Sequence, residues 1–251
     1  MVLIKTVDQI AKIARAGKIL RATLKLVAKE AKPGVTLTAL DRLAEKMIIK
    51  NGGKPAFLGY RPHGAKVGYP ATLCTSVNEI VVHGVPTSYK LKSGDLLSID
   101  CGVIIDGWYS DAAVTIGVGK ITPIAKKLIK VTEIALEKGI AAARAGNTVG
   151  DIGHAIGGFV KLNKMFTIKG LTGHGIGTAL HEDPSIFNEG NPGEGMKLQP
   201  GMVIAIEPMV ALGTGRVKQL SDDSFVMADG SLSAHFEKTI AITTKGPKIL
   251  T

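Results

Sequence analysis

Two aspartates stand in one short stretch of the chain that has the pattern of a β-hairpin. Residues 98–117 read SIDCGVIIDGWYSDAAVTIG, and the Asp-Gly pair at 106–107 is a strong signal for a two-residue hairpin turn. A turn there pairs Asp100 with Ala113 and places Asp111 diagonally beside Asp100 on the same face of the sheet. Carboxylates this close together must be protonated or bound to a cation. The hairpin therefore indicates a metal site, although two aspartates at solvent-exposed strand positions would show the same pattern.

Two glutamates lie in apolar segments with the composition of buried strands. Glu207 is part of MVIAIEPMV, and Glu237 is part of SAHFEKTIAITT, where alternation directs Ala234, Phe236, Ile240 and Ile242 to the opposite face. A buried carboxylate is costly without a partner, so two of them suggest a shared cation. A salt bridge to a lysine or an arginine would explain either glutamate by itself.

Three histidines accompany these acidic residues along the chain. His174 and His181 belong to LTGHGIGTALHEDP, and His83 belongs to NEIVVHGVP. The glycines on both sides of His174 allow a ligand or a backbone segment to approach closely. Taken alone, each histidine is more typical of an ordinary core or surface residue than of a ligand.

Four carboxylates and one imidazole together have the composition of a dinuclear metal site. The set is Asp100, Asp111, His174, Glu207 and Glu237. Its charge of about −4 balances two divalent cations, and such ligands suit Mn, Fe or Co and do not exclude Zn. Two ions about 3.5–4 Å apart form a known hydrolytic arrangement. The sequence has no GxSxG nucleophile motif and no P-loop lysine motif, which disfavours the corresponding chemistries.

Helix signals flank these strands on both sides. We expect one helix from about residue 7 to the Pro33-Gly34 pair, and others at 38–50, 123–144 and 149–162. We expect strands at 72–77, 80–83, 96–104, 109–116, 202–207, 209–211, 224–228 and 234–243. The order of a helix pair followed by strands occurs twice along the chain. This order predicts an α+β fold with a largely antiparallel sheet. No linker interrupts the chain, so we expect a single domain over residues 1–251.

The composition is that of a globular protein with an excess of positive charge. The chain has 251 residues, 45% of them hydrophobic, and a net charge of +10 from 31 Lys and Arg against 21 Asp and Glu. Two cysteines form no disulfide framework, and no apolar run approaches the roughly 18 residues of a membrane span. With no secretory signal, we expect a cytoplasmic protein without a membrane segment. The charge favours residence near ribosomes, although a solvated basic surface is the simpler explanation.

Five separated motifs resemble bacterial type I methionine aminopeptidase of the pita-bread metallopeptidase superfamily. They are NEIVVHGVP, SIDCGVIIDGWYSDAAVTIG, GHGIGTALHEDP, IEPM and SLSAHFEKTIAIT, in the order and spacing of that family. The resemblance implies a pita-bread fold, in which two α+β halves are related by pseudo-twofold symmetry around a dinuclear site. It also implies that Asp100, Asp111, His174, Glu207 and Glu237 are the metal ligands, with Asp111 and Glu237 bridging the two ions.

The same resemblance implies roles for the residues around the metals. Glu207 would handle the proton of the bridging water as well as bind metal. His83 and His181 would contact the scissile amide and stabilise the tetrahedral intermediate and the leaving amine. The expected reaction is hydrolysis of the N-terminal, initiator methionine from nascent proteins by a hydroxide bound to both metals.

The methionine pocket is expected to be narrow and apolar, as an unbranched thioether requires. Phe57, Tyr60, Tyr69 and Cys74 match its wall in the family. Three departures leave its shape open. The segment 61–67 is longer than in the common form, Leu180 replaces an aromatic residue, and the usual rim tryptophan is missing near Asp223 and Ser224.

Two other functions fit parts of this pattern. An Xaa-Pro aminopeptidase or dipeptidase would share the fold and the metal ligands. A catalytically silent ribosome-binding relative would share the fold and the basic charge, but such relatives usually lose ligands. We expect the protein to act on nascent polypeptide N-termini, as a monomer, with ribosome association through its basic surface.

Overall fold

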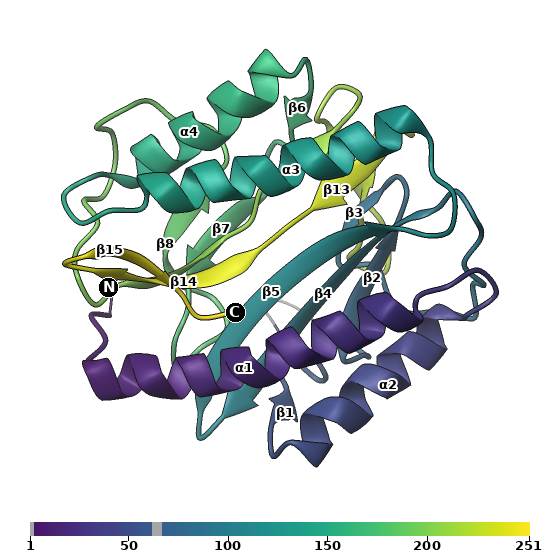
Figure 1. Cartoon of the computed structure of the whole chain (residues 1–251), viewed down its shortest axis with the longest axis horizontal. Helices are drawn as coiled ribbons and strands as arrows, with labels where there is room; N and C mark the ends of the chain where they lie inside the picture. The colour runs from purple at the N-terminus through teal and green to yellow at the C-terminus, as the bar shows by residue number, and fades with distance from the viewer. Residues whose placement is uncertain (1–2, 62–66) are drawn as a thin grey trace.

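Four long helices cover the strands in the part of the chain that the computed structural model describes, residues 3–61 and 67–251 (Figure 1). They are α1 (Val7–Glu30), α2 (Leu37–Lys50), α3 (Pro123–Ala142) and α4 (Val149–Leu162), which confirms the expected helices. Each begins after a threonine whose side chain accepts a backbone N–H of the first turn, because that N–H has no partner within the helix. The capping box of Thr6 and Gln9 is confirmed. No helix among the described residues is long and apolar enough to cross a membrane.

Within residues 3–61 and 67–251 the strands form four small sheets, and every pairing between these strands is antiparallel, as expected. The first contains β1 (Lys54–Pro55), β2 (Leu73–Val77), β4 (Leu96–Ile105) and β5 (Trp108–Gly117). The second contains β6 (Phe166–Thr167), β10 (Met209–Ala211) and β13 (Ser233–His235), and the third contains β3 (Ile80–Val82), β11 (Val217–Gln219) and β12 (Phe225–Met227). The fourth contains β7 (Thr172–Gly175), β8 (Glu182–Phe187), β9 (Val203–Ile206), β14 (Lys238–Thr243) and β15 (Gly246–Ile249).

The chain builds two similar halves, each with a helix pair over its strands. In Figure 1, α1 and α2 lie on one side of the strands, and α3 and α4 lie on the other. Ile13, Leu20 and Val27 recur every seven residues of α1, so all three face the sheet and are fully buried. Burial of each such side chain contributes about 1.5–3 kcal/mol to the free energy of folding. Separate apolar clusters under the two helix pairs hold the strands between them.

Two segments change sheets in the middle of the molecule. β9 pairs with β14, whereas the following β10 pairs with β13 of another sheet. The sequence predicted one continuous strand over 234–243, which is wrong, because residues 236–237 interrupt it between β13 and β14. Hydrophobic alternation continues through this break, so local pattern alone does not reveal it.

Several short strands have no clear signal in the sequence. β7 consists of Thr-Gly-His-Gly, and β8 includes a proline, and both residue types are rare in regular strands. β1, β6, β11 and β15 have only two to four residues each. Such strands exist because neighbouring strands offer unpaired backbone groups, which is a tertiary effect.

Candidate metal centre and substrate cavity

The β4–β5 hairpin carries both aspartates in the register predicted from the sequence. Ile105 pairs with Trp108 across the turn, Asp100 pairs with Ala113, and Gly102 pairs with Asp111. Asp100 also faces Cys74 of β2 on its other side. Because paired residues share a face, both carboxylates lie on the same face of the hairpin.

The two glutamates lie where the strands change sheets. Glu207 directly follows β9, and Glu237 directly precedes β14, whose Lys238 pairs with Ile206. The backbone N–H of Glu237 donates to the carbonyl of Ala113 in β5, which joins this segment to the hairpin. The crossing therefore brings both glutamates toward the aspartates, and they are not held by lysine or arginine ion pairs among the described residues.

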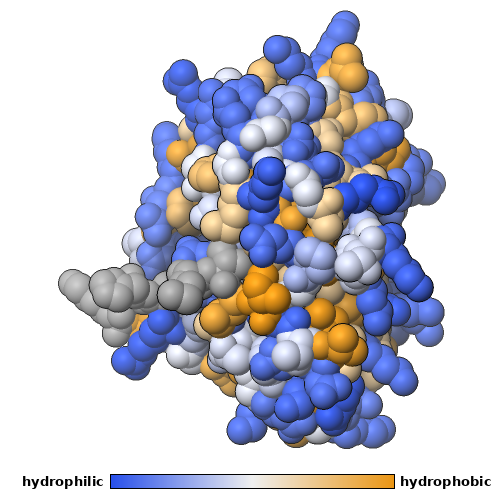
Figure 2. All heavy atoms as spheres, turned by 90° about the vertical axis from the view of Figure 1, so that its left-hand side faces the viewer, coloured by the Kyte–Doolittle hydropathy of each residue, from blue (hydrophilic) through white to orange (hydrophobic). Residues whose placement is uncertain are grey.

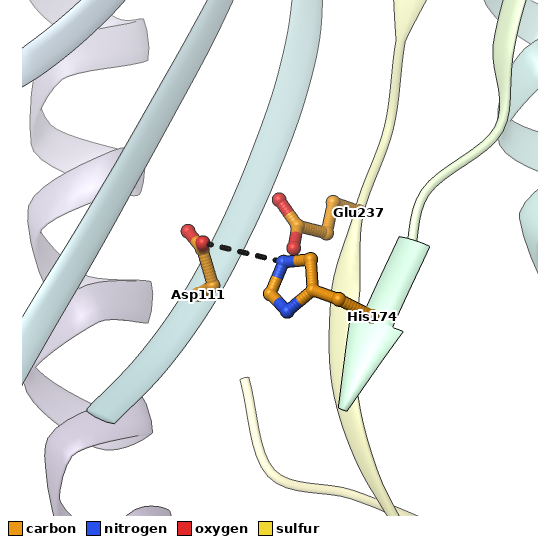
Figure 3. A group of neighbouring side chains, drawn as sticks. All are labelled: Asp111, His174 and Glu237. Carbon is orange, nitrogen blue, oxygen red and sulfur yellow. Dashed lines mark ion pairs between the residues drawn. The ribbon is translucent and has the colours of Figure 1, made fainter. Parts of the chain in front are cut away.

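His174 in β7 completes this group and presents one ring nitrogen to the carboxylates. Its Nδ1 lies 2.8 Å from the carbonyl oxygen of Gly175, so Nδ1 carries the proton and Nε2 keeps its lone pair. Nε2 lies 3.6 Å from Glu207 Oε1 and 4.0 Å from Asp111 Oδ2. Figure 3 shows the ring directed between Asp111 and Glu237.

The five residues line one cavity and form what we call the carboxylate–histidine cluster: Asp100, Asp111, His174, Glu207 and Glu237. Ligand atoms of Asp111, His174 and Glu237 all lie within 4.8 Å of one another. Asp100 Oδ1, Asp111 Oδ1 and Glu237 Oε1 are buried without a hydrogen-bond partner among the described residues. Orphaned buried carboxylate oxygens are costly unless they bind a cation, so the cluster fits divalent metal.

Burial raises the pKa of all four carboxyl groups in the cluster, and repulsion between carboxylates adds to the rise at Asp100, Asp111 and Glu237. Desolvation is the largest cause throughout, and it raises the pKa of Asp100 to about 7 and that of Glu207 to about 7. Desolvation followed by repulsion from Asp100 and Glu207 raises the pKa of Asp111 well above its usual value. Desolvation, with Asp111 as the strongest charged neighbour, does the same for Glu237. Without metal, these groups therefore hold protons at a pH where ordinary carboxyl groups are ionised.

These shifts predict that the metal-free protein loses stability as the pH rises. A carboxyl group with a raised pKa in the folded state favours folding below its unfolded pKa of about 4 and loses that contribution as the pH passes through about 7. We expect the urea midpoint of chelator-treated protein to fall between pH 5.5 and 8, and divalent metal to restore it. Asp100→Asn should flatten the dependence. A midpoint that rises with pH in this window would contradict the assignment.

Two further histidines line the cavity beside the cluster. The rings of His181 and His174 meet edge to face with centroids 4.5 Å apart, and the Tyr60 hydroxyl lies 2.7 Å from His181 Nδ1. His83 adopts a positive φ of 61° directly after β3 and packs against Phe225. Desolvation lowers the pKa of His83, and that of His181 to about 3, so both rings are neutral at pH 7.

The cavity has a volume of about 980 Å³, and apolar and aromatic side chains form the wall beside the cluster. This wall contains all four residues expected from the sequence, Phe57, Tyr60, Tyr69 and Cys74. Phe57 and Tyr69 meet edge to face, and the Tyr69 hydroxyl lies 3.0 Å from the carbonyl oxygens of Leu73 and Gly84. Burial raises the pKa of Cys74 well above its usual value, so it is a neutral thiol. The wall is thus apolar and fixed.

The three departures noted in the sequence fall around this cavity. Of the longer segment 61–67, residues 62–66 lie outside the described residues, while Val67 lines the cavity. Leu180 is buried in the wall. Where the rim tryptophan is missing, Asp222 and Asp223 line the opening.

Gly102 makes room for the aromatic wall. A Cβ at this position would lie 2.7 Å from Ala56 Cβ and 2.9 Å from Phe57 Cε1. We expect Gly102→Ala to lower the free energy of unfolding by about 1–3 kcal/mol and to raise KM for a methionyl peptide, because Phe57 must move. Gly158→Ala is the control, since nothing lies within 4 Å of its Cβ. Equal effects of the two variants on urea unfolding and on KM would contradict this prediction.

His235 is a buried residue of the site that the sequence reasoning did not identify. Its Nε2 lies 3.5 Å from Glu207 Oε2 and has no hydrogen-bond partner among the described residues. Desolvation lowers its pKa. The signal was present, because strand alternation puts residue 235 on the same face as Glu237.

Two halves enclose a buried carboxylate–histidine cluster that fits divalent metal, in a cavity that also has an apolar wall, which is the arrangement expected of a metal-dependent hydrolase. The sequence matches Metallopeptidase family M24 over residues 11–244, and the chain belongs to that family. It is 49% identical to a methionine aminopeptidase of Clostridium perfringens, over 100% of this chain and 99% of that protein. It is 43% identical to methionine aminopeptidase 1 of Bacillus subtilis, over 100% and 99% of the two chains.

Solved structures confirm the pita-bread fold. Methionine aminopeptidase from Rickettsia prowazekii superposes with a TM-score of 0.96 at 38% identity and covers 100% of both chains. Prolidase from Pyrococcus furiosus superposes with a TM-score of 0.78 at 24% identity, over 99% of this chain but 65% of that one. The second likeness concerns the fold alone.

Proposed function

We propose that this protein is a methionine aminopeptidase that removes the initiator methionine from nascent polypeptides. The observation that carries the proposal is the position of the carboxylate–histidine cluster in the same cavity as the apolar wall of Phe57, Tyr69 and Cys74. A methionine side chain against that wall brings its own amine and scissile carbonyl to the cluster. The full-length relatives named above support this substrate.

We propose that the cluster would hold two divalent ions, with Asp111 and Glu237 among their ligands. Ligand atoms of Asp111, Glu237 and His174 lie within 4.8 Å of one another, and Asp111 and Glu237 each have a buried oxygen without a hydrogen-bond partner among the described residues. The donor set accommodates Mn, Fe, Co or Zn. Ions bound there would act as Lewis acids on the scissile carbonyl and acidify the attacking water.

The protein groups around the cluster have separate tasks in this proposal. Glu207 accepts the proton of the attacking water and returns it to the leaving amine. In this proposal the Tyr60 O–H donates to His181 Nδ1, 2.7 Å away, so that the imidazole proton lies on Nε2 and can be donated to the scissile carbonyl. Desolvation raises the pKa of Tyr60, so its hydroxyl keeps the proton that it donates. His83, which lines the same cavity, contacts the same amide.

Metal titration with two peptides tests this function. Metal-free protein would receive increasing divalent metal while cleavage of Met-Ala-Ser and Ala-Pro-Ala is followed. Release of methionine that rises with metal, without release of alanine from Ala-Pro-Ala, is the expected result. Faster cleavage of Ala-Pro-Ala would assign the Xaa-Pro activity instead. Metal binding without any cleavage would favour a silent relative, a reading that the intact set of donors does not support.

We further propose a cytoplasmic monomer that meets its substrates at the ribosome. The net charge of +10 supports contact with a polyanion. The face in Figure 2 is mostly hydrophilic, with groups of hydrophobic side chains near its centre. Cosedimentation with ribosomes should weaken as salt is added, and salt-independent cosedimentation would contradict an electrostatic contact.

A further inference from the structure

A lysine at the start of the chain is buried against a glutamate beside His181. Lys5 Nζ lies 2.6 Å from Glu182 Oε2, and their side chains are only 3% and 8% exposed, although the residues are 177 apart in sequence. A buried ion pair adds little net stability, because both charges lose their hydration. A role in fixing local geometry would explain it better than a role in stabilising the fold.

Glu182 organises the loop that carries His181. Its second oxygen, Oε1, accepts the backbone N–H of Thr178 at 2.8 Å and that of Ala179 at 3.2 Å. These bonds close residues 178–182 into a tight turn. Leu180 of this turn is anchored in the apolar cluster around Phe57, whereas His181 has only the Tyr60 hydroxyl as a hydrogen-bond partner among the described residues. The backbone that carries His181 is thus bounded by Leu180 on one side and by the Glu182 carboxylate on the other.

Lys5 is itself held in place on both sides. Its backbone N–H donates to the carbonyl of Gly201 at 2.8 Å, and the next residue, Thr6, caps α1. Gly177 leaves room for the lysine stem, since a Cβ there would lie 2.6 Å from Lys5 Cε. Because the backbone of Lys5 is fixed, its ammonium group restrains the position of the Glu182 carboxylate.

We propose that Lys5 is a positioning residue for the reaction: its ion pair with Glu182 holds the 178–182 turn so that His181 faces the scissile carbonyl. The inference rests on the proposed function, in which His181 acts on the substrate. Loss of the ammonium leaves the cluster and the apolar wall intact and displaces His181. The consequence should therefore fall on kcat rather than on KM or on metal binding.

Steady-state kinetics of four metal-loaded proteins test the proposal. Lys5→Met should lower kcat about tenfold to a hundredfold, with KM and bound metal nearly unchanged. Lys5→Met with Glu182→Gln should recover part of kcat, because the glutamine oxygen still accepts from Thr178 and Ala179 without an unpaired charge. Lys130→Met, which breaks the exposed Lys130–Glu133 pair, should leave kcat unchanged. An unchanged kcat in Lys5→Met, or a loss of kcat no greater than the loss of bound metal, would overturn the proposal.

Hydrogen exchange gives a readout that does not need activity. The amides of Thr178 and Ala179 should exchange faster in Lys5→Met than in the parent protein, while the Glu237 amide bonded to Ala113 should be unaffected. If the parent protein fails to cleave Met-Ala-Ser, the proposed function fails, and the exchange result still decides whether Lys5 holds the turn. Unchanged exchange at residues 178 and 179 would overturn the positioning role.

Discussion

Asp111→Asn should abolish peptide hydrolysis together with metal binding. The substitution keeps the side-chain shape but removes one negative charge from the centre of the carboxylate–histidine cluster, where Asp111 lies within 4.8 Å of the donors of His174 and Glu237. We expect divalent metal affinity to fall by more than the ~10²-fold typical of residues that only support a ligand, and kcat to fall with it. Glu237→Gln should behave in the same way. Calorimetric metal titration beside Met-Ala-Ser kinetics measures both.

The same substitution, which weakens metal binding, should stabilise the metal-free protein. At pH 8 the folded apoprotein must keep its buried carboxyl groups either ionised or protonated, and both states cost free energy of folding. Replacing one carboxyl group with an amide removes that group's share of the cost. Chelator-treated Asp111→Asn should therefore unfold at higher urea than the chelator-treated parent. Asp106→Asn is a matched control on the same hairpin, since Asp106 is exposed at the turn and Asn-Gly supports that turn equally well. Retained metal affinity in Asp111→Asn, or equal loss in Asp106→Asn, would refute the central position of Asp111.

His181→Ala should lower kcat by on the order of 10²–10³ while both metal affinity and KM change little. The residue lies outside the group whose ligand atoms converge, yet its ring packs on His174 at 4.5 Å between centroids and lines the cavity. A donor that acts on charge developing at the scissile carbonyl contributes mainly in the transition state. Peptide kinetics with metal-loaded protein, and metal content after gel filtration, separate the two effects.

Two further variants serve as comparisons for His181→Ala. Tyr60→Phe removes the hydroxyl at His181 Nδ1 and should cause a smaller loss of kcat, because the ring stays in place but its tautomer is no longer selected. His154→Ala, at an exposed position of α4, should leave kcat unchanged. If His181→Ala loses metal in proportion to activity, His181 belongs with the ligands and its separate role is wrong.

The elements that the sequence alone determined are those with local causes. The helices begin where Thr6, Thr122 and Thr148 can cap them, and the Asp106-Gly107 turn fixes which residues of β4 and β5 pair. These interactions join residues 3 to 21 positions apart in one continuous segment, so a short stretch of chain contains all the information. The shared face of Asp100 and Asp111 follows directly from that register.

The tertiary structure decided where the remaining groups of the site meet. Hydrophobic alternation predicted a continuous strand through Glu237, whereas pairing with two different sheets breaks it at that residue. The Lys5–Glu182 pair had no distinctive local pattern, because the two residues lie far apart along the chain. Strand alternation placed His235 on the face of Glu237, but its contact with the distant Glu207 follows only from the tertiary structure. Residue types and spacing therefore identify the candidate metal-binding side chains of the site. The orientation of these side chains depends on long-range contacts, which form only when the two halves of the protein pack together.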